Sequence, residues 1–308
     1  MPGYRPSRRP FPPPRARLSR RAAIRRAAGS LAALAVAPVS LTACAPVALL
    51  DAVDPASGPV ERAIAYGDHP RQRLDLHRPA EGGAPPTAVA VWFYGGSWRN
   101  GERGHYDFAA RRLADAGAAT IVPDYRLYPE VTYPAFLEDG AAAVAWAVDR
   151  LGAGRPGGAP LILAGHSAGA YIAAMLALDP RWLDAAGPGR GVVDGWIGLS
   201  GPYDFYPFET RITRAVFAGL EEPRESQPIT HAGPGAPPCL LVTGESDGTV
   251  LPRNTRRLAE ALRAAGAPVE VVTVPGGHAT TLKALSRPFA DARVIDPVTR
   301  FIAGRASV

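Results

Sequence analysis

Acidic residues and lysine are both missing from residues 1–43, a stretch that contains nine arginines. The whole chain of 308 residues has a formal net charge of +6, so these arginines account for all of the excess and the remainder is mildly acidic. A nucleic-acid-binding domain carries its basic residues on a face of its folded part. The charge distribution therefore excludes nucleic acid as an expected partner.

Cysteine is scarce, with Cys44 and Cys239 as the two copies. Cys239 follows two prolines and begins an apolar run, a setting typical of a buried cysteine that packs as a small apolar residue. The acidic and histidine residues show no metal-ligand spacing either. A disulfide framework and a metal site are therefore not expected.

No apolar run near the N-terminus is convincing as a membrane-spanning helix, because residues 31–41 are too few and too rich in alanine. The flanking residues instead resemble an export signal: 19–25 (SRRAAIR) is similar to a twin-arginine signal, and 41–44 (LTAC) to a bacterial lipobox that places lipid on Cys44. We expect a lipoprotein signal (1–43), a tether (44–60) and one folded domain (61–308), exported and anchored in the cell-envelope membrane through Cys44. The alternative is a basic tail with a chance cysteine.

Continuous apolar strands alternate with helical stretches along the rest of the chain. The patterns predict strands at 74–77, 88–93, 118–122, 161–164, 192–199, 239–243 and 269–274. They predict helices at 106–116, 135–150, 168–178, 251–265 and from about 279 onward. This order indicates an α/β fold with a mostly parallel central sheet flanked by helices on both faces. The proline-rich and aromatic segment 202–237 is expected to be an irregular insertion or small lid.

Residues 165–169 (GHSAG) stand where a predicted strand runs directly into a predicted helix. Glycines two positions on either side of Ser167 leave room for a tight strand-to-helix turn that exposes the serine hydroxyl above the sheet. The amide of Ala168 then points to the same space from the helix N-terminus. We interpret Ser167 as a nucleophile; the alternative is an ordinary glycine turn.

A serine nucleophile needs a base and a carboxylate that orients the base. His278, just after the last predicted strand, is the best placed base, and Asp247, in the loop after the strand at 239–243, is the best placed carboxylate. Glu245 and Asp204 are its competitors. His166 is expected to pack beneath the turn, and the other histidines to be structural or solvated. The chain order Ser167, Asp247, His278 is that of the α/β-hydrolase triad.

The stretch 91–101 (VWFYGGSWRNG) ends a predicted strand in glycines whose amides can approach a developing oxyanion closely. We assign the oxyanion hole to the amides of Gly96, Ser97 and Ala168, with a possible slip in register to Gly95. Trp98, Tyr94 and Tyr203 are predicted to bind substrate. This chemistry requires no metal or organic cofactor.

Together, DYRLYP (124–129), GHSAGA (165–170) and GESDGTV (244–250) resemble the α/β-hydrolases of the carboxylesterase and hormone-sensitive-lipase-like group. The resemblance extends to feruloyl-esterase-like enzymes and to kynurenine formamidase, and it covers the chain from about residue 61 to its end. The chain departs from the pattern at Tyr94, where a histidine usually precedes the glycines. Tyrosine also occurs there in the cholinesterase-like branch.

These features predict a serine hydrolase that cleaves a small carboxylic ester through an acyl-enzyme. A large inserted cap domain is not evident, which favours small, accessible substrates. An amide hydrolase of the formamidase type and a catalytically silent binding lipoprotein of the same fold are the alternatives. The sequence makes no prediction about the oligomeric state.

Overall fold

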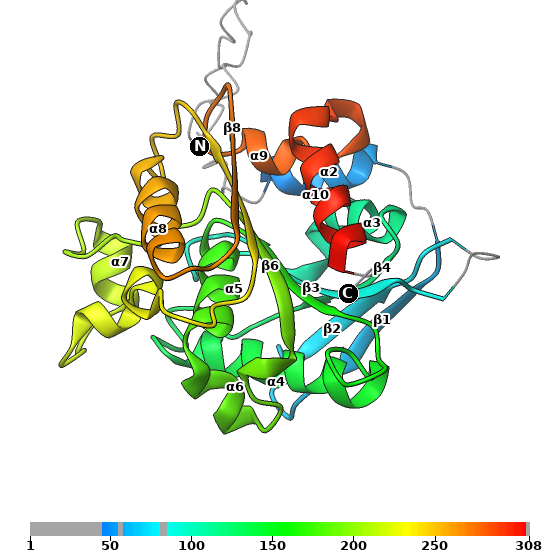
Figure 1. The fold of residues 1–308 in the computed structure, drawn as a ribbon, viewed down its shortest axis with the longest axis horizontal. Helices are drawn as coiled ribbons and strands as arrows, with labels where there is room; N and C mark the ends of the chain where they lie inside the picture. Colours follow the sequence, from blue (N-terminus) through cyan, green and yellow to red (C-terminus); the bar gives the residue numbers. More distant parts are fainter. Residues whose placement is uncertain (1–44, 55–57, 81–84, 306–308) are drawn as a thin grey trace, which may run out of the picture. The chain divides into compact units, whose positions relative to one another are not determined.

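A computed structural model describes residues 45–54, 58–80 and 85–305, all within one compact unit, Leu41–Val308. Its centre is an eight-stranded sheet in the order β1-β2-β4-β3-β5-β6-β7-β8 (Figure 1). The strands are β1 (Val60–Ala65), β2 (Arg73–His77), β3 (Ala88–Phe93), β4 (Ala118–Pro123), β5 (Leu161–His166), β6 (Val193–Leu199), β7 (Cys239–Gly244) and β8 (Val269–Val274). β2 pairs antiparallel with both β1 and β4, and all later neighbours pair in parallel.

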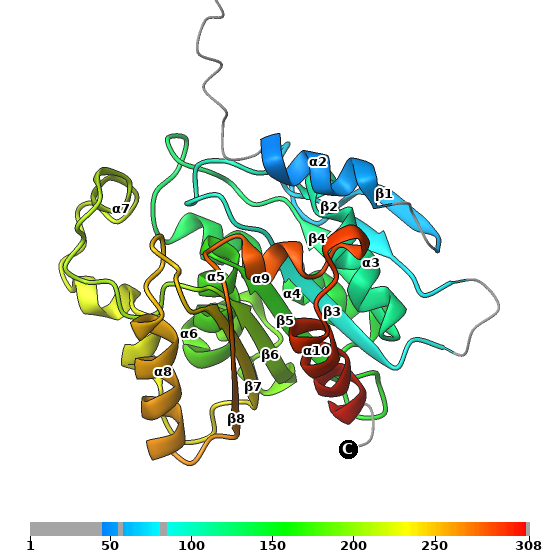
Figure 2. The same cartoon turned by 90° about the horizontal axis from the view of Figure 1, so that it is seen from above.

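Helices cover both faces of this sheet. The described helices are α2 (Ala45–Val53), α3 (Asp107–Asp115), α4 (Ala135–Leu151), α5 (Ala168–Leu178), α6 (Pro180–Ala186), α7 (Arg211–Val216), α8 (Arg253–Ala264), α9 (Thr280–Lys283) and α10 (Ala292–Arg305). Short 3₁₀ turns are η1 (Arg103–His105), η2 (Arg190–Val192), η3 (Pro223–Ser226), η4 (Pro228–His231) and η5 (Arg287–Phe289). Helices α4, α5 and α8 lie on one face, with α6 packed on α4 and α5, and α3 and α10 lie on the other (Figures 1 and 2).

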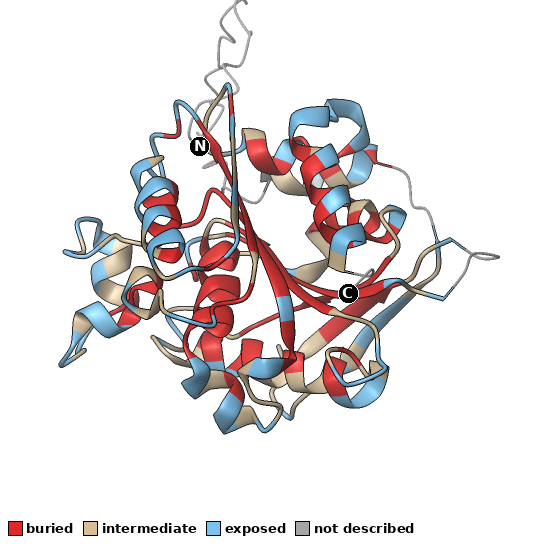
Figure 3. Ribbon diagram, viewed as in Figure 1, coloured by how far each residue is buried: buried red, intermediate tan, exposed pale blue. Residues whose placement is uncertain are grey.

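The core lies between these layers, and its central members are the strands that read as continuous apolar runs. Every residue of β3, β4, β5 and β7 is buried, as is every residue of α5 (Figure 3). Burial on both faces explains why these strands show no alternation of polar and apolar residues. The predicted α/β architecture is confirmed.

The register of the parallel strands brings several strand ends to one edge. Phe93 at the end of β3 pairs with Gly165 of β5, and His166 pairs with Leu199 of β6. Gly244 at the end of β7 pairs with Val274 at the end of β8. The loops that carry Ser97, Ser167, Asp247 and His278 therefore leave the sheet side by side, at the edge where open α/β sheets bind ligands.

The structure differs from the sequence prediction near the N-terminus. Part of the predicted tether (44–60) is helix α2, where Leu50 is 5% exposed and the Asp51 carboxylate accepts a 2.9 Å hydrogen bond from the amide of Phe108. Strand β1 was not predicted, because this edge strand buries none of its residues fully and shows no apolar period. Residues 1–43 and Cys44 lie outside the described residues.

Two further segments refine the prediction. The stretch expected to be one helix from about 279 consists of α9, η5 and α10. The 202–237 segment contains only short helical pieces, α7, η3 and η4, which fits the expected irregular insertion. Cys239 is a free, buried cysteine, and burial raises the pKa of its thiol to about 12. This is expected of a cysteine that packs as an apolar residue. None of the helices within the described ranges has the length and hydropathy to cross a bilayer.

The crossing of α5 over β3 gives a testable prediction for stability. A Cβ on Gly169 would lie inside contact distance of the Phe93 carbonyl oxygen and 2.6 Å from that of Tyr94, and backbone atoms cannot rotate away. We expect Gly169→Ala to lower the free energy of unfolding by about 3 kcal/mol or more in urea titrations. Gly104→Ala, where the added Cβ meets open space, is the control and should change it by less than about 0.5 kcal/mol. Equal free energies of unfolding for the two variants would contradict the close contact between α5 and the end of β3.

Candidate active site

Ser167 lies at the corner between β5 and α5 in a backbone conformation that side chains rarely adopt, with φ 55° and ψ −122°. Gly165 allows the close turn, since a Cβ there would lie 2.5 Å from the carbonyl carbon and oxygen of Gly169. The Ser167 amide donates to the Leu199 carbonyl at 2.9 Å, which ties the corner to β6. The sheet and helix therefore hold the serine hydroxyl in one orientation.

His278 joins Ser167 to Asp247. Its Nε2 lies 2.9 Å from Ser167 Oγ, and its Nδ1 lies 2.8 Å from Asp247 Oδ2. The structure thus brings together the three residues predicted from sequence, although they are far apart in the chain. The competitors lie elsewhere: Glu245 is exposed, and the Asp204 carboxylate pairs with Arg257 at 2.7 Å.

The Asp247 side chain is buried, with 0% of its surface exposed, and its hydrogen bonds fix the orientation of the carboxylate. Its Oδ1 accepts the backbone amides of Thr249 at 2.9 Å and Val250 at 2.8 Å, which leaves Oδ2 for His278. An ionised carboxylate only accepts, so the Nδ1 atom of His278 carries the proton and its Nε2 is free to accept from Ser167. This is the tautomer that a general base requires.

His166 supports the loop that bears His278. It is 6% exposed, and its Nε2 donates to the His278 carbonyl at 3.1 Å. Burial, followed by the neighbouring His278, lowers the pKa of His166 to about 3, so this imidazole stays neutral in the neutral range. The prediction that His166 packs beneath the turn is confirmed.

The predicted oxyanion donors belong to the turn after β3 and to the start of α5. As the first residue of α5, Ala168 has no intrahelical acceptor for its amide. Over the described ranges, the amides of Gly96 and Ser97 donate to no backbone carbonyl. A Cβ on Gly95 would lie 3.1 Å from the Ser167 Cβ, so the glycine turn lies directly against the serine. The turn that carries the amides of Gly96 and Ser97 therefore lies beside Ser167, as does the start of α5.

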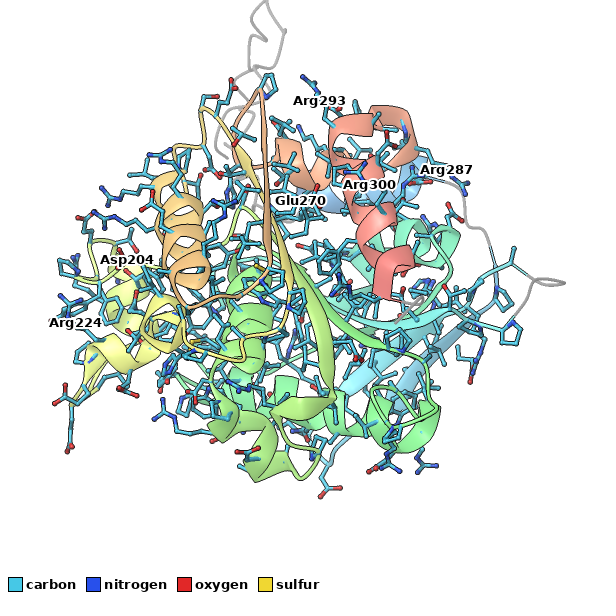
Figure 4. The ribbon with its side chains drawn as sticks, viewed as in Figure 1. Asp204, Arg224, Glu270, Arg287, Arg293 and Arg300 are labelled. Atoms are coloured by element: carbon cyan, nitrogen blue, oxygen red, sulfur yellow. The ribbon has the colours of Figure 1, made fainter. Side chains whose placement is uncertain are left out.

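A cavity of about 440 Å³ opens at Ser167. The oxyanion side contributes Ser97, Trp98 and Ala168. The remaining wall comes from the insertion, the loop that carries Asp247 and the start of α8. That wall consists of Pro202, Asp204, Phe205, Tyr206, Pro207, Glu209, Thr210, Ile212, Thr213, Thr249, Val250, Leu251, Arg253, Asn254 and Arg257. Figure 4 marks Asp204 in the insertion, beside α8. The cavity lining thus combines apolar side chains with charged side chains of both signs.

Two predicted substrate-binding residues do not line this cavity. Trp98 does line it, but Tyr94 and Tyr203 are each 0% exposed and point into the protein. Tyr94 bonds to Asp124 behind the glycine turn, and Tyr203 packs against Gly198 and Gly201. The prediction for these two tyrosines is wrong, because an aromatic residue after a strand has the same local pattern whether it faces a pocket or the core.

Asn254 is a site residue that the sequence analysis missed. It is 5% exposed and its Oδ1 accepts the backbone amides of Tyr203 and Asp204, both at 2.9 Å, so it anchors the insertion to α8. Nothing in the local sequence of an amphipathic helix announces such a contact. Across the part of the chain that the structure covers, no group of three or more histidine, cysteine or acidic residues is arranged to hold a metal ion.

The fold and site together define a doubly wound α/β protein with a serine-histidine-aspartate arrangement at the carboxyl edge of its sheet. The model of the alpha/beta hydrolase fold family matches residues 90–281, and the chain belongs to that family. This confirms the resemblance carried by the motifs around Asp124, Ser167 and Asp247.

Several known proteins are similar to this chain. Esterase LipC of Mycobacterium tuberculosis is 31% identical over 240 residues, which cover 70% of this chain and 59% of that protein. The isoprenylcysteine alpha-carbonyl methylesterase ICME of Arabidopsis thaliana is 30% identical over 247 residues, or 72% of this chain and 57% of ICME. The chain thus spans under three-fifths of the length of these curated relatives.

Solved structures share the fold. A truncated carbohydrate esterase from gut microbiota superposes with a TM-score of 0.70 at 20% identity, covering 83% of this chain and 100% of that one. Esterase 2 of Thermogutta terrifontis gives a TM-score of 0.63 at 22% identity, covering 81% and 94%. At this level of identity the likeness concerns the fold.

Proposed function

We propose that this protein hydrolyses a small carboxylic ester through an acyl-enzyme formed on Ser167. The observation that carries the proposal is the continuous path from the buried Asp247 through His278 to Ser167 Oγ, with hydrogen-bond distances of 2.8 and 2.9 Å, at the floor of an open cavity. The similarity to proteins named as esterases supports the same chemistry.

In acylation, Ser167 Oγ attacks the carbonyl carbon of the ester while His278 Nε2 takes the hydroxyl proton. The carbonyl oxygen of the ester becomes an oxyanion, which the amides of Gly96, Ser97 and Ala168 stabilise. His278 then gives its proton to the departing alcohol as the intermediate collapses. Asp247 stabilises the imidazolium that exists between these two transfers.

Deacylation repeats these steps with water as the nucleophile. His278 takes a proton from the water, the resulting hydroxide attacks the acyl carbon, and Ser167 Oγ leaves with the proton that His278 returns. The products are a carboxylic acid and an alcohol. All groups that the two steps require are side chains and amides of this chain.

The cavity favours small substrates. Its volume of about 440 Å³ falls at the lower end of the range for ligand pockets. Trp98, Phe205 and Ile212 supply apolar wall, which suits a short acyl chain or an aromatic group.

We propose further that the protein is an exported lipoprotein anchored through Cys44. The order of arginines, apolar segment and cysteine in residues 19–44 supports this. Mass spectrometry of the N-terminal peptide of the mature protein tests it: an acylated Cys44 is expected, and an unmodified cysteine in a membrane-free protein would contradict the anchor.

The experiment that tests the activity combines hydrolysis with active-site labelling. We expect the protein to hydrolyse p-nitrophenyl acetate and butyrate and to react once per chain with a fluorophosphonate probe. Peptide mapping should place the probe on Ser167. Folded protein that neither hydrolyses these esters nor binds the probe would refute the proposal. A preference for N-formyl aromatic amines over both esters would move the activity to amide hydrolysis.

A further inference from the structure

The turn that follows β3 carries two of the three proposed oxyanion donors, and its backbone is strained. Ser97 and Trp98 both have positive φ angles, 54° and 57°, a region that residues other than glycine rarely adopt. Such a conformation costs free energy and persists only where surrounding contacts hold it. Contacts from outside the turn must therefore hold residues 94–102, the oxyanion loop.

Both ends of the oxyanion loop bind the same buried carboxylate oxygen. At the start of the loop, Tyr94 Oη donates to Asp124 Oδ1 at 2.9 Å. Directly after the last residue of the loop, the backbone amide of Arg103 donates to the same Oδ1 at 2.8 Å, and the Arg103 guanidinium pairs with Oδ2. Asp124 directly follows β4, and its own amide donates to the Arg73 carbonyl at 2.9 Å, so the sheet positions it.

The ring of Tyr94 is fixed as firmly as its hydroxyl. It stacks between Tyr106 and Tyr125, with centroids 5.3 and 4.6 Å away. Nη2 of Arg71 donates to Tyr94 Oη at 2.8 Å and to the Gly101 carbonyl at 3.0 Å, which joins the tyrosine to the far side of the loop. The Tyr125 hydroxyl donates to the Tyr94 carbonyl at 2.7 Å. These contacts leave the start of the loop one position.

The Tyr94 hydroxyl also keeps its proton. Burial raises the pKa of Tyr94 well above its usual value, and the neighbouring Asp124 carboxylate raises it further. The phenol therefore remains a donor to Asp124 through the neutral and mildly alkaline range.

We propose that Tyr94 is a positioning residue of the oxyanion hole. Tyr94, Arg103 and Asp124 together form what we call the Asp124 clamp. The clamp fixes the start of the oxyanion loop relative to its end and so orients the amides of Gly96 and Ser97. Tyr94 does not line the cavity, so it acts through the backbone and touches no substrate. The effect on rate rests on the proposed ester hydrolysis.

Tyr94→Phe tests the clamp, because it deletes the hydroxyl and retains the stacked ring. Loss of one oxyanion donor lowers kcat by about 10²–10³-fold in other enzymes, and misaimed donors should cost less, so we expect a loss of roughly 10–100-fold. KM should stay within about twofold, since ground-state binding is unaffected. The affinity for a trifluoromethyl ketone, which mimics the tetrahedral intermediate, should fall by the same factor as kcat/KM.

Tyr66→Phe is the matched control. The Tyr66 hydroxyl donates to the backbone carbonyl of Asp124, so this variant removes a phenol bound to the same residue without touching the oxyanion loop. We expect its kcat and its trifluoromethyl ketone affinity to match those of wild type. Equal losses in both variants, alongside equal losses of thermal stability, would show a general structural effect and overturn the proposal.

Hydrogen exchange of the full chain separates this inference from the proposed function. Peptides covering residues 94–103 should exchange faster in Tyr94→Phe than in wild type or Tyr66→Phe. Unchanged exchange in Tyr94→Phe would overturn the clamp, whether or not wild type hydrolyses esters. If wild type hydrolyses no ester, the proposed function fails, while faster exchange confined to this loop still supports the clamp.

Discussion

Replacing Ser167 by alanine is expected to lower kcat for p-nitrophenyl butyrate by roughly 10⁶-fold, the loss seen when the nucleophile of a comparable triad is removed. The reason is that Ser167 Oγ is the atom that forms the covalent bond. The other hydroxyl-bearing residues of the described cavity lining are Ser97, Tyr206, Thr210, Thr213 and Thr249. None of these five hydroxyls is hydrogen-bonded to His278 Nε2, whose partner is Ser167 Oγ. Initial rates at saturating substrate measure the loss.

His278→Ala should cost about as much as Ser167→Ala, and the double variant should be no worse than either. The three side chains act as one unit, because removing either the serine or its base abolishes the same step. Circular dichroism and thermal unfolding would establish that each variant is folded. Additive losses in the double variant, or more than about 1% of wild-type kcat in Ser167→Ala, would contradict the assignment of the nucleophile.

The reacting residues could be predicted from sequence because each closely follows the end of a strand that the apolar pattern predicts. Ser167, Asp247 and His278 come after β5, β7 and β8, and parallel strands bring such loops to one edge of the sheet. The glycine spacing around Ser167 added a local signal that needs no tertiary information. Local patterns and a general rule of topology therefore sufficed for the reacting groups.

The surroundings of Tyr94 could not be predicted in the same way. Its hydrogen-bond partner Asp124 is 30 positions away. Its stacking partners are Tyr106 and Tyr125, and the sequence does not reveal the path of the chain that brings them to Tyr94. Local pattern makes Tyr94 an aromatic residue beside a glycine turn, which favoured a substrate-binding role. The ring of Tyr94 faces inward because it stacks on Tyr106, which follows η1, and on Tyr125, which lies just after β4.

The same limit explains the missed α2 and β1. Leu50 alone of the described α2 side chains is buried. The distant amides of Phe108 and Arg287 donate hydrogen bonds to the carboxylates of Asp51, in the helix, and Asp54, just after it. β1 contributes backbone pairing at an edge, where side chains stay partly exposed. Elements that are stabilised by remote partners, and not by their own apolar face, leave little trace in hydrophobic periodicity.

Asp247→Asn is expected to lower kcat by about 10⁴-fold while leaving the fold intact. The amides of Thr249 and Val250 both point at Oδ1, so the asparagine must place its oxygen there and turn its NH₂ toward His278. That NH₂ can only donate, so Nδ1 of His278 must accept and its proton moves to Nε2. Nε2 then faces Ser167 with a proton and cannot act as its base.

Glu245→Gln is the matched control, because Glu245 lies two residues away, is exposed and was the nearest competitor for this role. Its kcat should stay within about twofold of wild type, as expected of a surface change.

¹⁵N NMR of the His278 ring should report the tautomer directly: protonated Nδ1 in wild type and protonated Nε2 in Asp247→Asn. Intact mass should be checked after each assay, because asparagine before Gly248 is prone to deamidation, which would restore the aspartate. A variant that keeps the wild-type tautomer yet loses kcat would mean that Asp247 acts through its charge on the imidazolium. A loss in Glu245→Gln equal to that in Asp247→Asn would remove Asp247 from the triad.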